Sequence, residues 1–221
     1  MTVDPQTDPV LDRARAYFDR FAEEYDDAAA TAGWLPNDLL ADELPAVGSV
    51  GSAVDLACGT GRTLAVLRRA LPGADLVGVD VSPAMLGRAR ERVGDARYVQ
   101  ADVAGFVDRC DEEFDLVTAI GGFEFVSDLP SVLHGARALV RPGGHLVVTY
   151  EPLIAGWQPQ AARVETNLGA NGLDLTTFRW ESGEVEQGFD GWRCLRNRLV
   201  VAYLRDRLPT LYGWLHYRRP D

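Results

Sequence analysis

The stretch VDLACGTGR, residues 54–62, runs from an apolar strand into a turn that holds two glycines. Glycine lets a backbone bend sharply and approach a ligand with no Cβ in the way. In a doubly wound α/β sheet, ligands bind outside the carboxyl ends of the strands. The stretch therefore predicts a strand, a turn and a helix, with Gly59 and Gly61 against a nucleotide-like ligand.

The glycine spacing favours a ligand without a diphosphate. The dinucleotide fingerprint requires a third glycine where Leu64 stands, and the chain has no Gly-Lys-Ser/Thr sequence. All 22 positions counted as lysine or arginine are arginine. The absence of lysine excludes Schiff-base catalysis, the Tyr-x-x-x-Lys pair of short-chain dehydrogenases and the lysine of a P-loop. A nicotinamide-dependent reductase is therefore disfavoured.

Strand and helix patterns alternate along the first two thirds of the chain. Strands are expected at 52–57, 75–80, 97–100, 114–120 and 144–150. Helices are expected at 9–29, 36–44, 61–71, 83–93, 103–109 and 130–140. Ser82 before Pro83 and Asp128 before Pro130 are typical helix starts. Such alternation predicts right-handed crossovers and a parallel sheet.

The pattern changes after Glu151. A loop at 152–174, with a short helix at 158–168, is expected before the strand-like TTFRW and a helix at 182–189. Two β-rich stretches, 192–204 and 210–218, predict a hairpin at the sheet edge. The expected α/β fold is Rossmann-like and doubly wound, a mostly parallel seven-stranded sheet with a C-terminal antiparallel hairpin and an N-terminal helical lid. We expect one domain over 1–221: a lid at 1–45, a core at 46–151 and a substrate-side segment with the hairpin at 152–221.

Acidic residues end the next two predicted strands. Asp80 stands about 20 residues beyond the glycines, where a carboxylate can accept from both hydroxyls of a ribose. Asp102 ends the third strand, where a carboxylate can accept from an adenine amino group. Acids at the same edge as the glycine turn indicate an adenosine site.

These segments together resemble the class I S-adenosylmethionine (SAM)-dependent methyltransferases, in their small-molecule bacterial type. VDLACGTGR looks like the first motif of that family, GVDVSPAML (78–86) its acidic second, YVQADV (98–103) its third and FDLVTAIGGFEFVSD (114–128) its fourth. ALVRPGGHLVVTYEP (138–152) resembles the segment that follows, and FDRFAEEYDD (18–27) resembles the N-terminal lid.

The resemblance implies SAM as cofactor, S-adenosylhomocysteine as its product, and a set of binding residues. Asp55, Ala57, Gly59 and Gly61 would line the methionine moiety, beside Cys58 and Thr60 of the same turn. Asp80 would hold the ribose, Val81 and Met85 would flank the adenine, and Asp102 with Val103 would contact its edge. Ile120 and Gly121 would close the site under the sulfonium, and Tyr17 and Tyr25 would reach the cofactor or the substrate. Cys58 is interpreted as a small packing residue.

A general base is not identified by the sequence. Candidates must follow the fourth or fifth strand at the cofactor edge, and Glu124, Tyr150 and Glu151 meet that condition. Each of them could instead orient the substrate or support the structure. His145 begins the fifth strand at the opposite end, His134 lies within a predicted helix and His216 lies in the predicted hairpin.

The acceptor is expected to be a small metabolite, methylated at O, N or C. The stretch AIGGFEF (119–125) lacks the Asn/Asp-Pro-Pro-aromatic tetrad of many nucleic-acid and glutamine methyltransferases. Trp157, Phe178 and Trp180 favour an aromatic or hydrophobic acceptor, of the kind met in natural product biosynthesis, although core packing explains them as well. Two alternatives stay open: a SAM-binding enzyme of the same fold that catalyses a rearrangement or cyclisation, and a protein or RNA methyltransferase.

Composition limits the partners. The formal net charge of −11 disfavours nucleic acid and anionic membranes, because affinity for both depends on basic residues. Three separated cysteines and three histidines without ligand spacing predict no metal site and no disulfide framework. With neither a signal-peptide pattern at the start nor a long apolar run, the chain is expected to be soluble and cytoplasmic. The sequence leaves the oligomeric state open.

Overall fold

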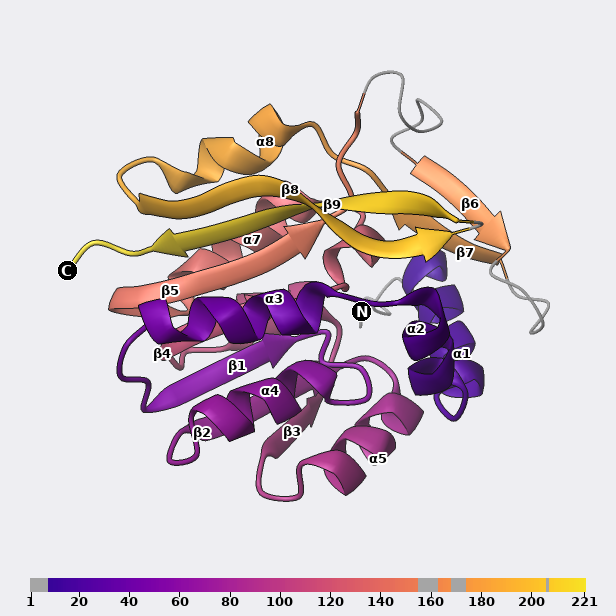
Figure 1. Cartoon of the computed structure of the whole chain (residues 1–221), viewed down its shortest axis with the longest axis horizontal. Helices are drawn as coiled ribbons and strands as arrows, with labels where there is room; N and C mark the ends of the chain where they lie inside the picture. Colours follow the sequence, from indigo (N-terminus) through magenta and orange to yellow (C-terminus); the bar gives the residue numbers. More distant parts are fainter. Residues whose placement is uncertain (1–7, 155–162, 168–173, 206) are drawn as a thin grey trace, which may run out of the picture.

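The computed structural model describes residues 8–154, 163–167, 174–205 and 207–221. Seven strands form one sheet in the order β3-β2-β1-β4-β5-β9-β8 (Figure 1). The strands of this sheet are β1 (Ser52–Leu56), β2 (Asp75–Asp80), β3 (Arg97–Gln100), β4 (Phe114–Ala119), β5 (Val140–Tyr150), β8 (Arg193–Arg205) and β9 (Leu208–Arg218). β1 to β5 run parallel, and β9 is antiparallel to both of its neighbours. The predicted Rossmann-like sheet with a C-terminal antiparallel hairpin is confirmed.

Helices cover both faces of the sheet. The helices are α1 (Pro9–Phe21), α2 (Tyr25–Ala32), α3 (Pro36–Glu43), α4 (Arg62–Ala70), α5 (Pro83–Arg92), α6 (Val103–Arg109), α7 (Leu129–Ala138) and α8 (Ser182–Glu186), with short 3-10 turns η1 (Leu44–Ala46), η2 (Phe123–Phe125) and η3 (Gln187–Phe189). One core layer joins α3, α4 and α5 to the sheet through Leu40, Leu64 and Leu86. The other joins α6 and α7 through Phe106 and Leu133.

The two caps predicted from sequence, Ser82 and Asp128, form as expected, and Asp102 adds a third cap that was not predicted. The Ser82 hydroxyl accepts from the N–H of Met85, Asp102 accepts from Gly105, and Asp128 accepts from Ser131. Each cap satisfies an N–H that the first helical turn leaves without a partner. The caps therefore fix where α5, α6 and α7 begin, directly after the sheet edge that carries the site.

The lid differs from the single helix predicted at 9–29. The chain turns at residues 22–24, so that α1 and α2 are separate helices, and Gly33 ends α2 in a left-handed conformation. The reason is tertiary, because each helix is attached to a different turn of the sheet. Asp19 of α1 accepts from Ser82 Oγ at 2.6 Å, and Asp26 of α2 accepts from Thr60 Oγ1 at 2.8 Å.

Residues after Glu151 also differ from the prediction. β6 (Arg163–Asn167) lies where a loop with a short helix was expected. It pairs antiparallel with β7 (Asp174–Phe178), which begins two residues before the predicted strand-like TTFRW. The helix predicted at 158–168 is wrong over 163–167, and the rest of it lies outside the described residues. β7 packs against α1, whose Ala14 and Tyr17 form a cluster with Leu175. That contact favours an extended strand over a surface loop.

β5 begins four residues earlier than predicted, because the Arg-Pro-Gly-Gly segment joins the strand instead of ending a helix. Its pairing with β4 shifts register between Phe114 and Leu116, which accommodates the proline and the glycines.

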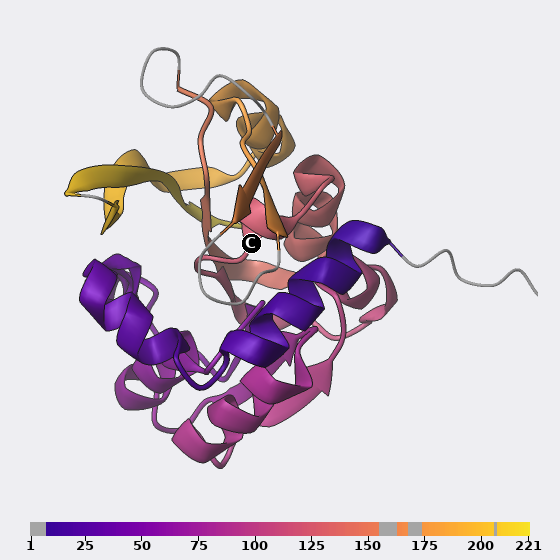
Figure 2. The same ribbon diagram turned by 90° about the vertical axis from the view of Figure 1, so that its right-hand side faces the viewer.

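The lid helices and the small sheet gather at one end of the molecule. Figure 1 shows α1, α2, β6 and β7 at the end toward which the arrows of β1 and β5 point. Figure 2 looks onto that end, with α1 crossing it. The carboxyl edge of the parallel strands is therefore covered by elements from both ends of the chain.

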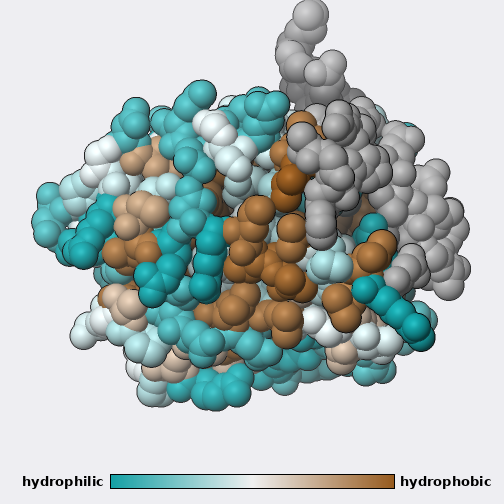
Figure 3. Space-filling view, turned by 45° about the horizontal axis from the view of Figure 1, so that its top comes forward, coloured by the Kyte–Doolittle hydropathy of each residue, from teal (hydrophilic) through white to brown (hydrophobic). Residues whose placement is uncertain are grey.

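The outer edge of the sheet carries exposed apolar side chains. Leu199, Val201, Leu204 and Leu208 are exposed on the β8–β9 hairpin. Figure 3 shows a band of apolar residues across the face that comes forward in that view. Within the described part of the chain, no helix combines the length and apolar character needed to span a membrane.

Gly213→Ala should destabilise the fold, because Gly213 pairs with Tyr150 and a Cβ there would lie 2.1 Å from the tyrosine ring. We expect the free energy of unfolding to fall by about 1–3 kcal/mol. Gly87→Ala is the control, since its Cβ meets nothing within 4 Å and helix α5 should gain about 0.5–1 kcal/mol. Urea titration followed by circular dichroism measures both; equal stability of the two variants would contradict this β5–β9 register.

Candidate functional site

The turn after β1 has an unusual backbone. Ala57 has a φ of 56°, a conformation that few residues other than glycine adopt, and Gly59 and Gly61 also have positive φ. A Cβ on Gly122 would lie 2.4 Å from that of Ala57, so the turn after β4 packs directly on the turn after β1. A Cβ on Gly61 would meet Ala89 of α5 at 3.1 Å. The backbone is thus held close on both sides.

Asp80, the last residue of β2, links the turn after β1 to the turn after β2. Its Oδ2 accepts from the N–H of Gly59 at 2.8 Å, and its Oδ1 accepts from the N–H of Ser82 at 2.9 Å. Burial raises the pKa of the Asp80 carboxyl, while these two hydrogen bonds oppose the rise. Both oxygens keep acceptor capacity beyond these bonds, so a fixed carboxylate is presented to the space beside it.

A cavity of about 320 Å³ lies along the ends of β1, β2 and β3. Ala57, Asp80, Val81, Asp102 and Val103, all predicted from sequence, line it together with Phe18 of the lid and Phe125. Met85 does not line it; its side chain is 1% exposed on the inner face of α5. Asp102 uses one oxygen to cap α6 at 2.7 Å. The lining combines apolar side chains with several aspartates, Asp80 and Asp102 among them, a combination that suits a nucleoside.

A narrower pocket of about 30 Å³ lies over the glycine turn. Its walls include Tyr25, Ala57, Cys58, Gly59, Thr60, Ile120 and Gly121, all of which the sequence predicted. Neither Asp55 nor Gly61 lines it. Cys58 is buried, and burial raises the pKa of its thiol.

Asp55 carries a buried oxygen without a partner. Its Oδ1 accepts from Thr118 Oγ1 at 2.7 Å, whereas its Oδ2 has no hydrogen-bond partner among the described residues. Burial raises the pKa of this carboxyl to about 8, and the charge of Asp80 adds to the rise. A cation beside Oδ2 would stabilise the ionised form. The carboxylates of Asp80 and Asp55 therefore fit a ligand with an adenosine at one end and an ammonium at the other, as SAM has.

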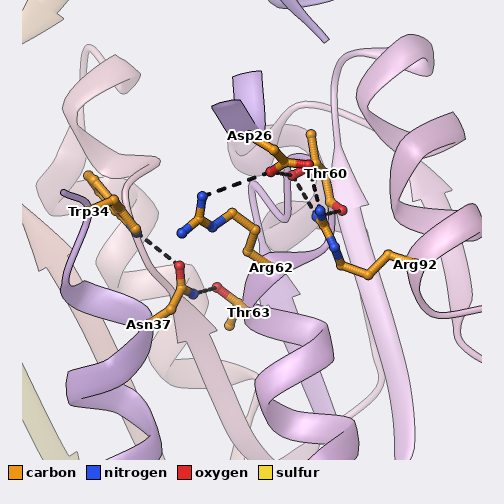
Figure 4. Close-up of polar contacts among 7 residues, drawn as sticks. All are labelled: Asp26, Trp34, Asn37, Thr60, Arg62, Thr63 and Arg92. Carbon is orange, nitrogen blue, oxygen red and sulfur yellow. Dashed lines mark hydrogen bonds and ion pairs between the residues drawn. The ribbon is translucent and has the colours of Figure 1, made fainter. Parts of the chain in front are cut away.

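The lid is attached to the glycine turn by an ion pair (Figure 4). Arg92 of α5 donates to Asp26 Oδ2 and to Thr60 Oγ1, and Thr60 Oγ1 in turn donates to Asp26 Oδ1. Arg62 lies 4.0 Å from the same carboxylate. Nothing local in the sequence identifies these partners, because they are separated by 32 residues or more along the chain.

Trp34 covers the turn after β4. A Cβ on Gly121 would lie 2.6 Å from the indole, and Gly121 has a φ of 78°. The indole N–H donates to Asn37 Oδ1 at 2.9 Å, and Asn37 donates to Thr63 Oγ1 at 3.1 Å, as Figure 4 shows. The sequence did not single out Trp34 or Asn37. Together they hold the chain between α2 and α3 against the turn.

A third cavity, of about 140 Å³, opens beside Gly121, and we call it the aromatic cavity. Its aromatic lining is Tyr17, Phe18, Phe21, Tyr25, Trp34, Phe125, Tyr203 and Tyr212. Its other lining residues are Gly121, Glu124, Glu151, Thr177, Arg179 and Arg205. Tyr25, Trp34 and Gly121 also line the pocket over the glycine turn, so the two spaces share a wall.

Glu124 is buried in the wall of the aromatic cavity. Tyr212 donates to its Oε1 at 2.6 Å, and its Oε2 has no partner in the described part of the chain. Burial raises the pKa of this carboxyl to about 7, with Glu151 adding to the rise. A carboxyl with that pKa can accept a proton near neutral pH.

Glu151 forms a buried ion pair with Arg179. Two guanidinium nitrogens of Arg179, Nε and Nη2, donate to Glu151 Oε1 at 2.9 and 2.8 Å. The Arg179 side chain is 6% exposed and the Glu151 side chain is 9% exposed. A carboxylate held in this way orients Arg179. The third guanidinium nitrogen, Nη1, is buried with no partner among residues 8–154, 163–167, 174–205 and 207–221.

Tyr150, Phe178 and Trp180 do not line the aromatic cavity. Tyr150 is buried against Gly213 and its hydroxyl donates to Ser182 at 3.2 Å, outside the aromatic cavity. Along β7 and its continuation, Thr177 and Arg179 line the cavity, and Phe178 and Trp180, predicted for this role, do not. Trp157 lies outside the described residues.

The histidines lie away from this edge. His145 Nδ1 is 2.9 Å from His216 Nε2, and His216 Nδ1 is 3.2 Å from Glu43 Oε2. Burial lowers the pKa of both imidazoles, that of His145 to about 4. His134 lies on α7. Among the residues that the structure describes, no cluster of three or more histidine, cysteine or acidic side chains could hold a metal.

Comparisons with known proteins find similarity to methyltransferases. A family model described as "Methyltransferase domain" matches residues 54–146. A trans-aconitate 2-methyltransferase of Paracidovorax citrulli is 39% identical over 95 residues, 43% of this chain and 36% of that protein. One from Enterobacter is 36% identical over 103 residues, 47% of this chain and 40% of that protein. The matches thus span well under half the length of these relatives.

Solved structures share the fold. The magnesium protoporphyrin IX methyltransferase of Synechocystis, with bound SAM, superposes with a TM-score of 0.68 at 13% identity, covering 98% of this chain and all of that chain. Streptomyces venezuelae DesVI gives 0.63 at 22% identity, over 90% and 98% of the two chains. SAM is the cofactor of the family to which these findings point. The methyltransferase-domain match over residues 54–146, the named relatives and the shared fold agree in supporting a class I SAM-dependent methyltransferase.

Proposed function

We propose that this protein transfers a methyl group from SAM to a small molecule held in the aromatic cavity. The observation that carries this proposal is the wall that the pocket over the glycine turn shares with the aromatic cavity, at Tyr25, Trp34 and Gly121. A methyl donor in the pocket and an acceptor in the aromatic cavity would therefore lie side by side at these three residues. Proximity of this kind supplies much of the rate of a displacement reaction.

Most residues that would hold the cofactor line the cavity along β1, β2 and β3 or the pocket over the glycine turn. Asp55 lines neither space and lies in β1. Asp80 would accept from the ribose hydroxyls, Val81, Asp102 and Val103 would surround the adenine, and the oxygen of Asp55 that lacks a partner would face the ammonium. Ala57, Gly59 and Gly121 would let the backbone approach the methionine part. When bound, this cofactor supplies a methyl group on a cationic sulfur.

The chain contributes positioning, exclusion of water and a proton acceptor. α1 and α2 cover the sheet edge and are attached through Asp19 and Asp26, so solvent is kept from the site. Glu124 would accept the proton that an oxygen or nitrogen acceptor loses. Glu151 would hold Arg179 in place.

A small molecule suits the size of the aromatic cavity. At about 140 Å³ it is smaller than the roughly 300–1,000 Å³ of pockets for drug-sized ligands. The relatives named for trans-aconitate also have a small-molecule substrate in their name. We propose no nucleic-acid partner, because the net charge of −11 opposes phosphate binding.

Methyl transfer is tested by incubating the protein with methyl-labelled SAM and a panel of small acids, phenols and amines. Labelled product together with stoichiometric S-adenosylhomocysteine supports the proposal. Consumption of an acceptor without release of S-adenosylhomocysteine would instead indicate a rearrangement or cyclisation and would contradict methyl transfer.

Asp80→Asn should weaken binding of S-adenosylhomocysteine. An amide cannot accept from both backbone N–H groups and also from two ribose hydroxyls. We expect the dissociation constant in calorimetry to rise about 10- to 100-fold, a loss of about 1.4–2.8 kcal/mol. The control is Asp75→Asn, at the exposed start of the same strand. Equal affinity of the two variants would contradict the assignment of Asp80 to the ribose.

Glu124→Gln should remove a step from the pH dependence of methyl transfer. The raised pKa of about 7 keeps Glu124 protonated in acid, so the rate of the native protein should rise with pH through about 7 as the carboxylate forms. Glutamine still accepts from Tyr212 but takes no proton, and we expect the rate at pH 8 to fall about 100-fold or more.

The control for this variant is Glu91→Gln, which removes an exposed partner of Arg88. Initial rates between pH 5.5 and 9 measure all three proteins. An unchanged profile in Glu124→Gln would show that this carboxyl is not the proton acceptor.

A further inference from the structure

Two residues in the lining of the aromatic cavity, Glu124 and Arg179, each carry one buried polar atom without a hydrogen-bond partner among the residues described. Oε2 of Glu124 is an acceptor and Nη1 of Arg179 is a donor, and neither has a partner in the described parts of the chain. The residues are 4% and 7% exposed. Buried polar groups without partners are costly, so a polar ligand that satisfies both would be bound strongly.

The geometry fixes where each of these atoms points. Arg179 is held by two nitrogens on one carboxylate oxygen of Glu151, and a guanidinium is planar, so the direction of Nη1 is set by that pair. Glu124 is fixed in turn by the hydroxyl of Tyr212. Both side chains are therefore held in fixed orientations in the lining of the aromatic cavity.

We propose that the aromatic cavity selects a one-ring acceptor molecule that carries a hydroxyl or amino group at one end, bound by Glu124, and a single carboxylate at the other, bound by Arg179. This inference rests on the proposed methyl transfer and names the substrate class of the same site. The group that faces Glu124 is the one that would be methylated, since Glu124 follows Gly121 by three residues and lies in the turn after β4.

The charges of the lining limit the anionic part to one carboxylate. Glu124 and Glu151 are both acidic, and Arg179 is already neutralised by Glu151. Arg205 donates to the hydroxyl of Tyr203 and lies over its ring at 5.7 Å. A tricarboxylate such as trans-aconitate would leave carboxylates facing these acids. The cavity is thus expected to differ in selectivity from the relatives named for that compound.

The walls favour a ring between the two polar ends. Eight aromatic residues line the cavity, and the volume of about 140 Å³ suits one ring with two substituents. Offset or edge contacts between rings add to apolar burial. A flexible polyol or a long chain would satisfy neither the walls nor the two fixed polar atoms.

Calorimetric titration with defined probes tests this proposal. The probes are the three hydroxybenzoate isomers, the three aminobenzoate isomers, phenol, benzoate and trans-aconitate. Each is titrated into the protein with and without saturating S-adenosylhomocysteine. We expect at least one disubstituted ring to bind about 10-fold or more tightly than phenol, benzoate and trans-aconitate. The hydroxyl and amino series show which nucleophile the cavity takes.

Two variants assign the contacts. Arg179→Lys keeps a cation beside Glu151 but removes Nη1, and it should reduce the preference over phenol to within about threefold. Glu124→Gln should likewise reduce the preference for the disubstituted ring over benzoate to within about threefold. Arg97→Lys, at an exposed ion pair with Glu112, is the matched control and should bind like the native protein. Thermal melting shows whether each variant is folded.

The proposal is overturned if no isomer exceeds phenol and benzoate in affinity. It is equally overturned if a folded Arg179→Lys keeps the full preference for the carboxylate. Failure of the proposed methyl transfer has a different signature, which is the absence of heat when S-adenosylhomocysteine itself is titrated. The probe titrations without that compound report on the cavity in either case.

Discussion

One carboxylate organises the sheet edge of this protein. Asp80 accepts a backbone N–H from the turn after β1 and another from the turn after β2, at Gly59 and Ser82. Those turns begin α4 and α5, so the same side chain sets both helix starts and the walls of the space between them. Ser82 is also the residue to which α1 is attached through Asp19. The cofactor site, the two helices and the lid thus depend on a single buried acid.

The lid lines both the pocket over the glycine turn and the aromatic cavity. α2 is held by Asp26 to Thr60 and Arg92, and the chain after it is held by Trp34 over Gly121 (Figure 4). The contacts that attach the lid are therefore made by the residues of the glycine turn and its neighbours. The shape of the pocket over the turn therefore depends on where the lid helices are held. In the proposed reaction, selectivity for the acceptor would come from the aromatic cavity, which aromatic rings line together with Glu124 and Arg179.

Much of the fold follows from local patterns. Strand ends, glycine turns and capping residues are encoded within a few positions of one another, and so the parallel core, Asp80 and the turn at 57–61 could be predicted. Glu124 could be placed by its position after the fourth strand. The break at 22–24, the strand at 163–167 and the Glu151–Arg179 pair depend on contacts between distant segments, which no local pattern records. Phe178 and Trp180 differ from prediction because alternate residues of an extended chain face opposite sides.

The central claim is that Asp80 and the glycine turn hold an adenosine whose methionine part reaches Gly121. A crystal structure of the complex with S-adenosylhomocysteine tests it most directly. The account predicts the ribose hydroxyls within hydrogen-bond distance of Asp80, the ammonium beside Oδ2 of Asp55 and the sulfur at the wall shared with the aromatic cavity. A ligand bound with its ribose away from Asp80, or with its sulfur facing away from Gly121, would contradict it.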